Sequence, residues 1–155
     1  MTPAHHLNPR LVALVALGGM IGTSGRYLIS QAMPSHGGWP VATFVANVVG
    51  SFLLGALLEA LLRHGRESPR GRAVRLGVGT GVLGGFTTFS SLALELERFL
   101  AHDALLTAAT YAVASLSCGL LACLLGVVLA ARHHQWRRAR AARRADPPKS
   151  GEPGR

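Results

Sequence analysis

The chain has 155 residues, of which 49% are apolar, 15% are charged and 19 are glycine, a composition typical of membrane proteins. The net charge of +9 would favour nucleic acid as the partner of a soluble protein, but the arginines here flank long apolar runs, so membrane lipids are expected and nucleic acid is not. The seven histidines lie in predicted tails and loops, with no nucleophile or acid pattern around them, which argues against an enzyme.

Four long apolar segments are expected to cross the membrane as helices, at about 11–32, 40–62, 76–97 and 105–131. Residues 1–10 form a short polar segment before them, and the basic residues 132–155 form a tail that we expect to be disordered or bound to the membrane surface. Membrane lipids are expected to contact the chain through this tail and through the basic connection between the second and third spans. Lysine and arginine outside the spans number fourteen on one side and one, Arg98, on the other, which predicts that both termini are cytoplasmic. The sequence therefore predicts an all-α, multi-pass protein of the inner or plasma membrane, with a four-helix transmembrane domain over residues 11–131.

The first two predicted spans each carry a polar side chain that a plain span would not need. In the first, Arg26 follows glycines at 18 and 22. An arginine there faces the bundle interior or a water-filled vestibule, or it snorkels to the interface, and these alternatives stay open. In the second, Asn47 is the only strongly polar side chain near the middle, and it makes either an interhelical hydrogen bond or part of a site.

The third predicted span is organised around glycines and hydroxyls. Glycines at 77, 81 and 85 recur every fourth residue and so line one helix face, where another backbone can approach closely. Gly84 and Gly85 weaken the helix, and the hydroxyl-rich run 87–91 follows at bilayer depth, so we expect a break near Gly84–Thr88. Broken backbone in a membrane needs cover from protein or water, which makes this stretch a candidate ion or substrate site.

The fourth predicted span carries Tyr111 and Ser115 on one stripe at helical spacing, which is either a packing surface or part of the site. Cys118 and Cys123 lie five residues apart on the same predicted helix and so point in different directions. We therefore expect neither a disulfide nor a metal site between them.

Four fragments together resemble the small bacterial fluoride channels of the CrcB/Fluc family over about residues 11–129. The most specific part is the run Gly84-Gly85-Phe86-Thr87-Thr88-Phe89-Ser90 together with Asn47-Val48-Val49-Gly50-Ser51-Phe52 upstream. The fragments run from Gly18 to Tyr27, from Thr43 to Phe52, from Thr80 to Ser90 and from Tyr111 to Gly119.

The resemblance implies a fluoride-specific channel that exports fluoride passively and lowers its cytoplasmic concentration. It implies two subunits inserted antiparallel, as a homodimer or a heterodimer, with two narrow pores along their interface. It also implies a structural Na⁺ held by the backbone carbonyls of Gly84 and Thr87, and Arg26 is expected at a vestibule. By position, the residues that would line or shape the fluoride path are Asn47, Phe89, Ser90, Tyr111 and Ser115.

These residue types also suit fluoride on chemical grounds. Fluoride is small and tightly hydrated, so a pore must replace water with amide N–H and hydroxyl donors and still release the ion. Asn47 and the serines are such donors. A phenyl ring has a positive edge, so Phe89 presented edge-on can lie beside an anion.

Two features depart from the family pattern. Leu92 and Ala93 stand where the family usually has a second phenylalanine and a serine, so half of the paired ring edges are missing. The charge bias would hold the chain in one orientation, whereas family members that insert both ways as homodimers need little bias. The alternative is therefore a subunit of a heteromeric channel that needs an inverted partner.

Two further alternatives come from other classes. A small multidrug or cation exporter needs an intramembrane carboxylate, and the chain offers only Glu59 and Glu95, at span ends. A protein that binds nucleic acid or lipid through its tail would use the arginines of residues 132–155, where Trp136 is the one aromatic residue.

Overall fold

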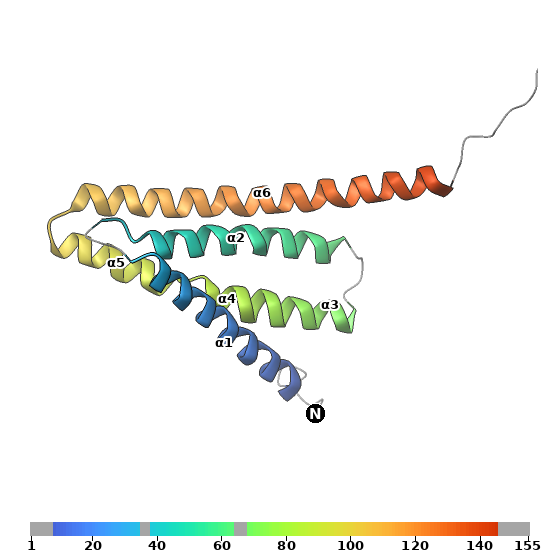
Figure 1. Ribbon diagram of the computed structural model, residues 1–155, viewed down its shortest axis with the longest axis horizontal. Helices are drawn as coiled ribbons and strands as arrows, with labels where there is room; N and C mark the ends of the chain where they lie inside the picture. Colours follow the sequence, from blue (N-terminus) through green and yellow to red (C-terminus); the bar gives the residue numbers. More distant parts are fainter. Residues whose placement is uncertain (1–7, 35–37, 64–67, 146–155) are drawn as a thin grey trace, which may run out of the picture.

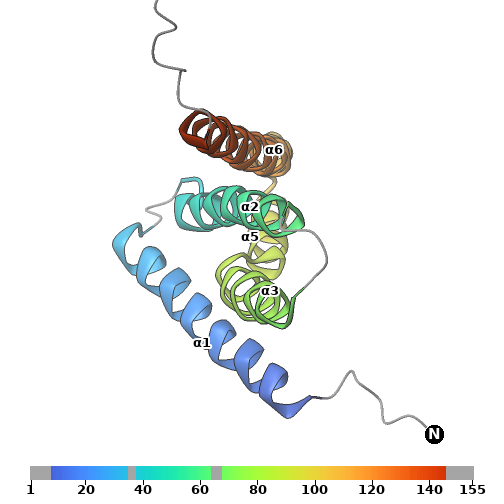
Figure 2. The same cartoon turned by 90° about the vertical axis from the view of Figure 1, so that its right-hand side faces the viewer.

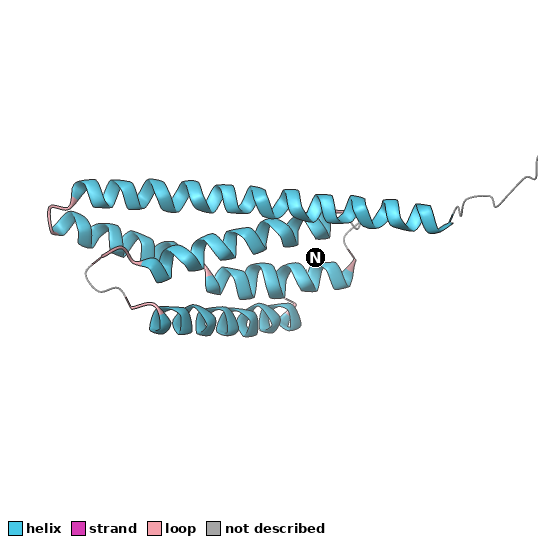
Figure 3. Ribbon diagram, turned by 45° about the horizontal axis from the view of Figure 1, so that its top comes forward, coloured by secondary structure: helices cyan, strands magenta, loops and turns pink. Residues whose placement is uncertain are grey.

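The computed structural model describes residues 8–34, 38–63 and 68–145, and every regular element within them is a helix. This confirms the all-helical prediction. In chain order the elements are α1 (Pro9–Ala32), α2 (Val41–Leu62), α3 (Pro69–Val74), the π-helix η2 (Arg75–Leu83), α4 (Gly84–Phe86), α5 (Phe89–Ala101) and α6 (Leu105–Ala145) (Figure 1, Figure 3).

Three of these helices are long and apolar enough to cross a membrane, namely α1, α2 and residues 105–141 of α6. The lengths of these helices and the composition of the chain both indicate a membrane protein. The predicted third span, 76–97, is divided among η2, α4 and α5, which together contain no single long helix.

The helices lie in layers. α2 packs along α6, and α1 crosses η2 and α4 on the far side of the molecule (Figure 1, Figure 2). The start of α1, the end of α2, the start of α3 and the last part of α6 lie at one end in Figure 1, and the turn between α5 and α6 lies at the other. Arginines begin or follow each of these segments, so most of the described basic residues, apart from Arg26 and Arg98, gather at one end of the molecule.

The predicted glycine seam is confirmed at the crossing of α1 over η2 and α4. A Cβ added at Gly81 would lie 2.8 Å from the carbonyl oxygen of Val15 and 3.0 Å from Cα of Gly18. A Cβ added at Gly85 would lie 2.5 Å from the carbonyl oxygen of Gly19. The two backbones are therefore in direct contact, which only glycine permits at this distance.

A second close contact joins α2 to α6. A Cβ added at Gly126 would lie 3.0 Å from the backbone nitrogen of Ala56, and one added at Gly55 would meet Cys123. Both Cys118 and Cys123 are free thiols.

The helical path between α4 and α5 is interrupted at Thr87 and Thr88. Thr87 has φ −77° and ψ 156°, and Thr88 has φ −151° and ψ 118°, so both residues are extended. The chain re-enters a helix at once, because the Thr88 side chain accepts a hydrogen bond from the backbone N–H of Ser91 (3.1 Å) and so caps α5.

The end of α6 differs from the expectation of a disordered tail from residue 132. α6 continues without a break to Ala145 and extends beyond the neighbouring helices (Figure 1). The physical reason is composition, because residues 132–145 are rich in alanine and arginine and contain no glycine or proline. Residues 146–155 and 1–7, which belong to the predicted terminal segments, lie outside the described residues.

Candidate ion site at the interrupted helix

Asn47 bridges the interruption from α2. Its side-chain Nδ2 donates to the backbone carbonyl of Thr88 (3.0 Å), and the backbone N–H of Thr88 donates to Asn47 Oδ1 (2.7 Å). The amide therefore bonds both backbone groups of Thr88, as a neighbouring strand would. Of the two roles left open by the sequence, the structure shows a hydrogen bond between helices that is directed at the break.

The bond to Asn47 changes which carbonyls remain exposed at the end of α4. The N–H of Thr88 goes to Asn47 and not to the carbonyl of Gly84, its acceptor in an uninterrupted α-helix. One residue earlier, both the N–H and the hydroxyl of Thr87 bond the carbonyl of Leu83 (2.9 Å each). Gly84 is exposed on this protomer. The end of α4 therefore presents backbone carbonyl oxygen, which carries a partial negative charge.

These features fit a small hard cation, which prefers oxygen ligands. Gly84 has an exposed position with no Cβ, and Thr87 turns its carbonyl out of the helical path. Among the described residues, no group of three or more histidine, cysteine or acidic side chains could hold a metal ion. When bound, a Na⁺ would supply positive charge that offsets the helix-end dipole.

Arg26 from α1 reaches the same end of α4. Its Nε donates to the carbonyl of Gly85 (3.3 Å), and the hydroxyl of Thr23 also donates to that oxygen (3.4 Å). Arg26 is half-buried. The described side chain is therefore bonded to the interrupted helix and is not simply extended toward the membrane surface.

The start of α5 gathers hydroxyl groups beside an exposed ring. The Thr88 hydroxyl lies 3.2 Å from the hydroxyl of Ser90 and 3.1 Å from that of Ser91. Phe89 is 76% exposed, so its ring projects from this protomer, and Ser90 is exposed next to it. The first-turn N–H groups of α5 point toward the same region, so this surface carries hydrogen-bond donors.

Leu92 does not share this surface with Phe89. It is only 4% exposed and lies within the core of its own protomer. Within the described residues, Leu92 therefore does not border the surface that carries the Phe89 ring.

A second polar cluster lies at the next level along the same helices. Glu95 on α5 accepts two hydrogen bonds, from the hydroxyl of Thr43 on α2 (2.6 Å) and from that of Tyr111 on α6 (2.7 Å). Tyr111 is fully buried, with its ring 5.3 Å from that of Trp39 and 5.9 Å from that of Phe99. Glu95 is thus an internal carboxylate, although its position in the sequence suggests only the end of a span.

Ser115 lies one helical turn from Tyr111 and is 6% exposed. Its hydroxyl makes no hydrogen bond with any described residue. A buried hydroxyl without a partner has a free donor, which is unusual unless water or an ion meets it.

The two clusters form one connected row. Thr43 and Asn47 are four residues apart on α2, and Ser91 and Glu95 are four apart on α5. Residues at that spacing share a helix face about one turn apart. The row therefore continues from the interruption, past Asn47, toward Glu95 and Tyr111. Sequence reasoning missed Glu95 and treated Thr43 only as part of a fragment, although the shared four-residue spacing was a usable signal.

Comparison with known proteins identifies the family. The sequence model of a family described as CrcB-like protein, Camphor Resistance (CrcB), matches residues 13–127. The chain belongs to the CrcB family. The resemblance inferred from the four fragments is thereby confirmed.

Several curated relatives cover most of the chain. A protein of Leifsonia xyli named Fluoride-specific ion channel FluC 2 is 44% identical over 126 residues, covering 81% of this chain and 87% of its own length. A FluC 1 of Rhodococcus jostii is 46% identical over 128 residues, covering 83% and 91%. A FluC of Caulobacter vibrioides is 45% identical over 119 residues, covering 76% and 92%. Because these CrcB relatives are named as ion channels, the expectation that the chain is not an enzyme is also confirmed.

Proposed function

We propose that this CrcB protein forms a fluoride-specific channel that lets fluoride leave the cytoplasm passively across the inner or plasma membrane. The observation that carries the proposal is the row of polar side chains at the interrupted helix, from Ser90 past Asn47 to Tyr111 and Ser115, in which the Ser115 hydroxyl has no partner among the described residues. It occurs in a chain whose relatives are named fluoride-specific ion channels.

The row suits an anion that must shed water. Amide N–H and hydroxyl groups can replace the hydration shell of fluoride, and none of them binds it through full charge, so the ion can leave again. The unpartnered Ser115 hydroxyl is one such donor. The edge of Phe89 offers a weakly positive rim at the exposed start of the row.

In this proposal residues 76–97 form the fourth membrane crossing as a broken span. A break at bilayer depth requires cover, and Asn47 supplies part of it through its two bonds to Thr88. The rest of the cover comes from an inverted second subunit, which packs over the exposed Phe89 and Gly84. With the basic residues facing the cytoplasm, both termini of this chain are cytoplasmic.

The carbonyls of Gly84 and Thr87 hold the structural Na⁺ at the centre of this dimer. The ion is not transported, and the residues that hold it fix the broken ends relative to the partner. The partner is a second copy of the chain or, as the alternative, an inverted CrcB homologue that supplies a second phenylalanine. The position of Leu92 inside its own protomer favours neither.

The proposal is tested by fluoride efflux from liposomes that contain the purified chain, with and without a candidate inverted homologue. We expect efflux driven by the fluoride gradient alone, no chloride efflux, and no dependence on a proton gradient. Phe89→Ala should abolish most of the efflux, whereas Leu94→Ala, which alters another exposed apolar residue of α5, should not. Absence of fluoride efflux under both conditions, or efflux that requires a proton gradient, would overturn the proposal.

A further inference from the structure

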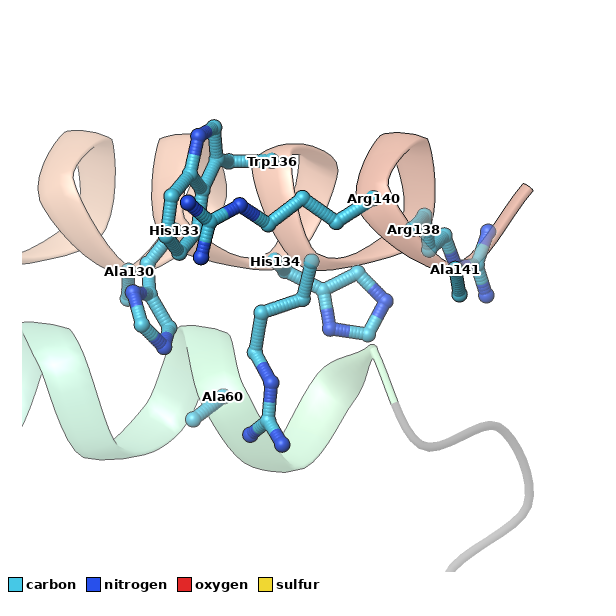
Figure 4. A pocket seen from close by; sticks show the side chains of 9 residues that line it. Ala60, Ala130, His133, His134, Trp136, Arg138, Arg140 and Ala141 are labelled. Atoms are coloured by element: carbon cyan, nitrogen blue, oxygen red, sulfur yellow. The ribbon is translucent and has the colours of Figure 1, made fainter. Parts of the chain in front are cut away.

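The helical extension of α6 carries a groove that the ion path does not use. The groove has a volume of about 740 Å³ and lies between the last turns of α2 and residues 130–141 of α6. Figure 4 shows His133, His134, Trp136 and Arg140 on α6, with Ala60 of α2 below them. The groove therefore lies at the end of two helices that are long enough to span a membrane.

The groove is strongly basic. Arg137, Arg138 and Arg140 line it, and none of the described residues that line it is acidic. The nearest acid on the last turns of α2, Glu59, already pairs with Arg63. The guanidinium groups are therefore available to an anion, and their planar donors match phosphate oxygens.

One of these groups is held in place by an aromatic ring. The guanidinium carbon of Arg140 lies 3.8 Å from the ring centroid of Trp136, one helical turn earlier (Figure 4). Stacking restrains the side chain and leaves the in-plane N–H donors free to bond. A restrained donor loses less entropy when it binds a ligand than a mobile surface arginine does.

The position of the groove relative to the bilayer follows from the continuity of α6. The helix is unbroken from Leu105 to Ala145, so the apolar part fixes the height of the basic part. Residues 105–131 span about 40 Å at about 1.5 Å per residue, which exceeds the hydrocarbon core of about 30 Å. The next turns, which include Trp136, therefore lie at headgroup level, where tryptophan is favoured.

The lining also changes from apolar to basic along the helix axis. Ala60 and Ala130 line the membrane side of the groove, and Val128 and Leu129 are exposed just before it. A ligand that satisfies both parts has an anionic head and an apolar tail. A free phosphate ion would leave the apolar part without a partner.

We infer that this groove binds the headgroup of an anionic phospholipid, with its acyl chains running along α6 toward Leu129. The inference does not depend on which ion the chain conducts. It assigns the helical extension a role as a lipid-binding arm that holds the basic end of the molecule at one membrane surface.

The test measures lipid retention by native mass spectrometry of the detergent-solubilised full chain, titrated with phosphatidylglycerol or phosphatidylcholine of identical acyl chains. We expect preferential binding of phosphatidylglycerol. Loss of each arginine at a membrane surface costs about fivefold in affinity, so Arg137→Gln/Arg140→Gln should weaken binding about 25-fold. The matched control Arg70→Gln/Arg72→Gln removes two exposed charges from α3, outside the groove, and should change it less than about twofold.

All four substitutions affect exposed side chains, and unchanged gel-filtration profiles will show that the variants are folded. Three results would each overturn the inference. Equal losses in the groove and control variants would mean that only net charge matters. Equal binding of both lipids would exclude headgroup recognition, and displacement of the lipid by an equal concentration of inorganic phosphate would assign the groove to a soluble anion.

Discussion

The side chain of Asn47 supplies both hydrogen-bond partners that Thr88 lacks because the helix is interrupted there. Its Nδ2 donates to the carbonyl, and its Oδ1 accepts from the N–H of the same residue. No charged or apolar side chain of similar size can do both. Asn47 is therefore needed for the local backbone as well as for any ion beside it.

Asn47→Asp tests whether this side chain also faces the ion. Aspartate can still accept the N–H of Thr88, but it cannot donate to the carbonyl, and its charge repels an anion. A hydrogen bond from the Asn47 amide to the charged fluoride ion is worth about 1.5–3 kcal/mol. Its loss should lower fluoride efflux by about tenfold to a hundredfold. Gln31→Glu, an amide-to-carboxylate change at an exposed position of α1, is the control and should leave efflux unchanged. Normal efflux in Asn47→Asp would show that this residue does not face the ion.

Tyr111 gives a second prediction, because its hydroxyl bonds the internal carboxylate of Glu95 while its ring packs between Trp39 and Phe99. Tyr111→Phe keeps the ring and removes the bond, leaving Glu95 with one hydroxyl partner from Thr43. We expect the free energy of unfolding to fall by about 1–3 kcal/mol, measured by thermal unfolding in detergent.

The matched control for this substitution is Tyr27→Phe. The hydroxyl of Tyr27 is exposed and accepts a hydrogen bond from Gln31 (2.8 Å), so its loss should cost less than about 0.5 kcal/mol. If the two variants had the same free energy of unfolding, a group other than the Tyr111 hydroxyl would have to hydrogen-bond the Glu95 carboxylate.

At the scale of the elements, the packing of α1 on η2 and α4 depends on the absence of side chains. A Cβ at Gly18 would contact the carbonyl oxygen of Gly77 and lie 3.0 Å from Cα of Gly81. A Cβ at the adjacent Gly19 would have no heavy atom within 4 Å. The two positions therefore differ in whether an added Cβ would meet the facing backbone.

Gly18→Ala and Gly19→Ala should consequently change stability in opposite directions. Gly18→Ala must push α1 away from η2 and lower the melting temperature. Gly19→Ala adds a better helix former where there is room and should stabilise by about 0.5–1 kcal/mol. Thermal unfolding of both variants in one detergent decides this, and equal destabilisation would show that α1 does not pack on η2 through this seam.

The elements also show which parts of the molecule could be predicted from sequence. The spacing of Gly77, Gly81 and Gly85 predicts the seam because a helix face depends only on local period. The break near Gly84–Thr88 follows from glycine and hydroxyl content in an apolar run. The exposure of Phe89 and the burial of Leu92 could not be predicted, because residues three apart lie on one side of a helix and only the packing of α5 against α2 and α6 decides which of them is covered.

Contacts between distant residues were harder to predict. The Glu95 cluster joins residues that are 52 and 16 positions apart, and nothing local in the sequence indicates that Thr43 and Tyr111 meet the same carboxylate. The helical extension of α6 was predictable from composition, because residues 132–145 contain good helix formers. High charge in this segment favours disorder, but the helix propensity of its residues keeps it helical to Ala145.

For the whole molecule, the distribution of charge predicts a single orientation. The start of α1, the α2 end, the start of α3 and the basic part of α6 lie at one end, and the α5–α6 turn lies at the other (Figure 1). With this bias the chain should insert with the basic end in the cytoplasm. An inverted dimer would then require a partner of opposite charge bias, and the chain alone should conduct poorly.

Orientation can be measured independently of transport by labelling single cysteines with a membrane-impermeant maleimide in intact cells. With Cys118 and Cys123 replaced by alanine, His102→Cys in the α5–α6 turn should be labelled from outside, and Ser68→Cys before α3 should be labelled only after lysis. Both positions are exposed, so access to the reagent depends on the side of the membrane. Labelling of both from outside would indicate dual insertion, in which case a homodimer suffices and robust fluoride efflux from the chain alone should follow.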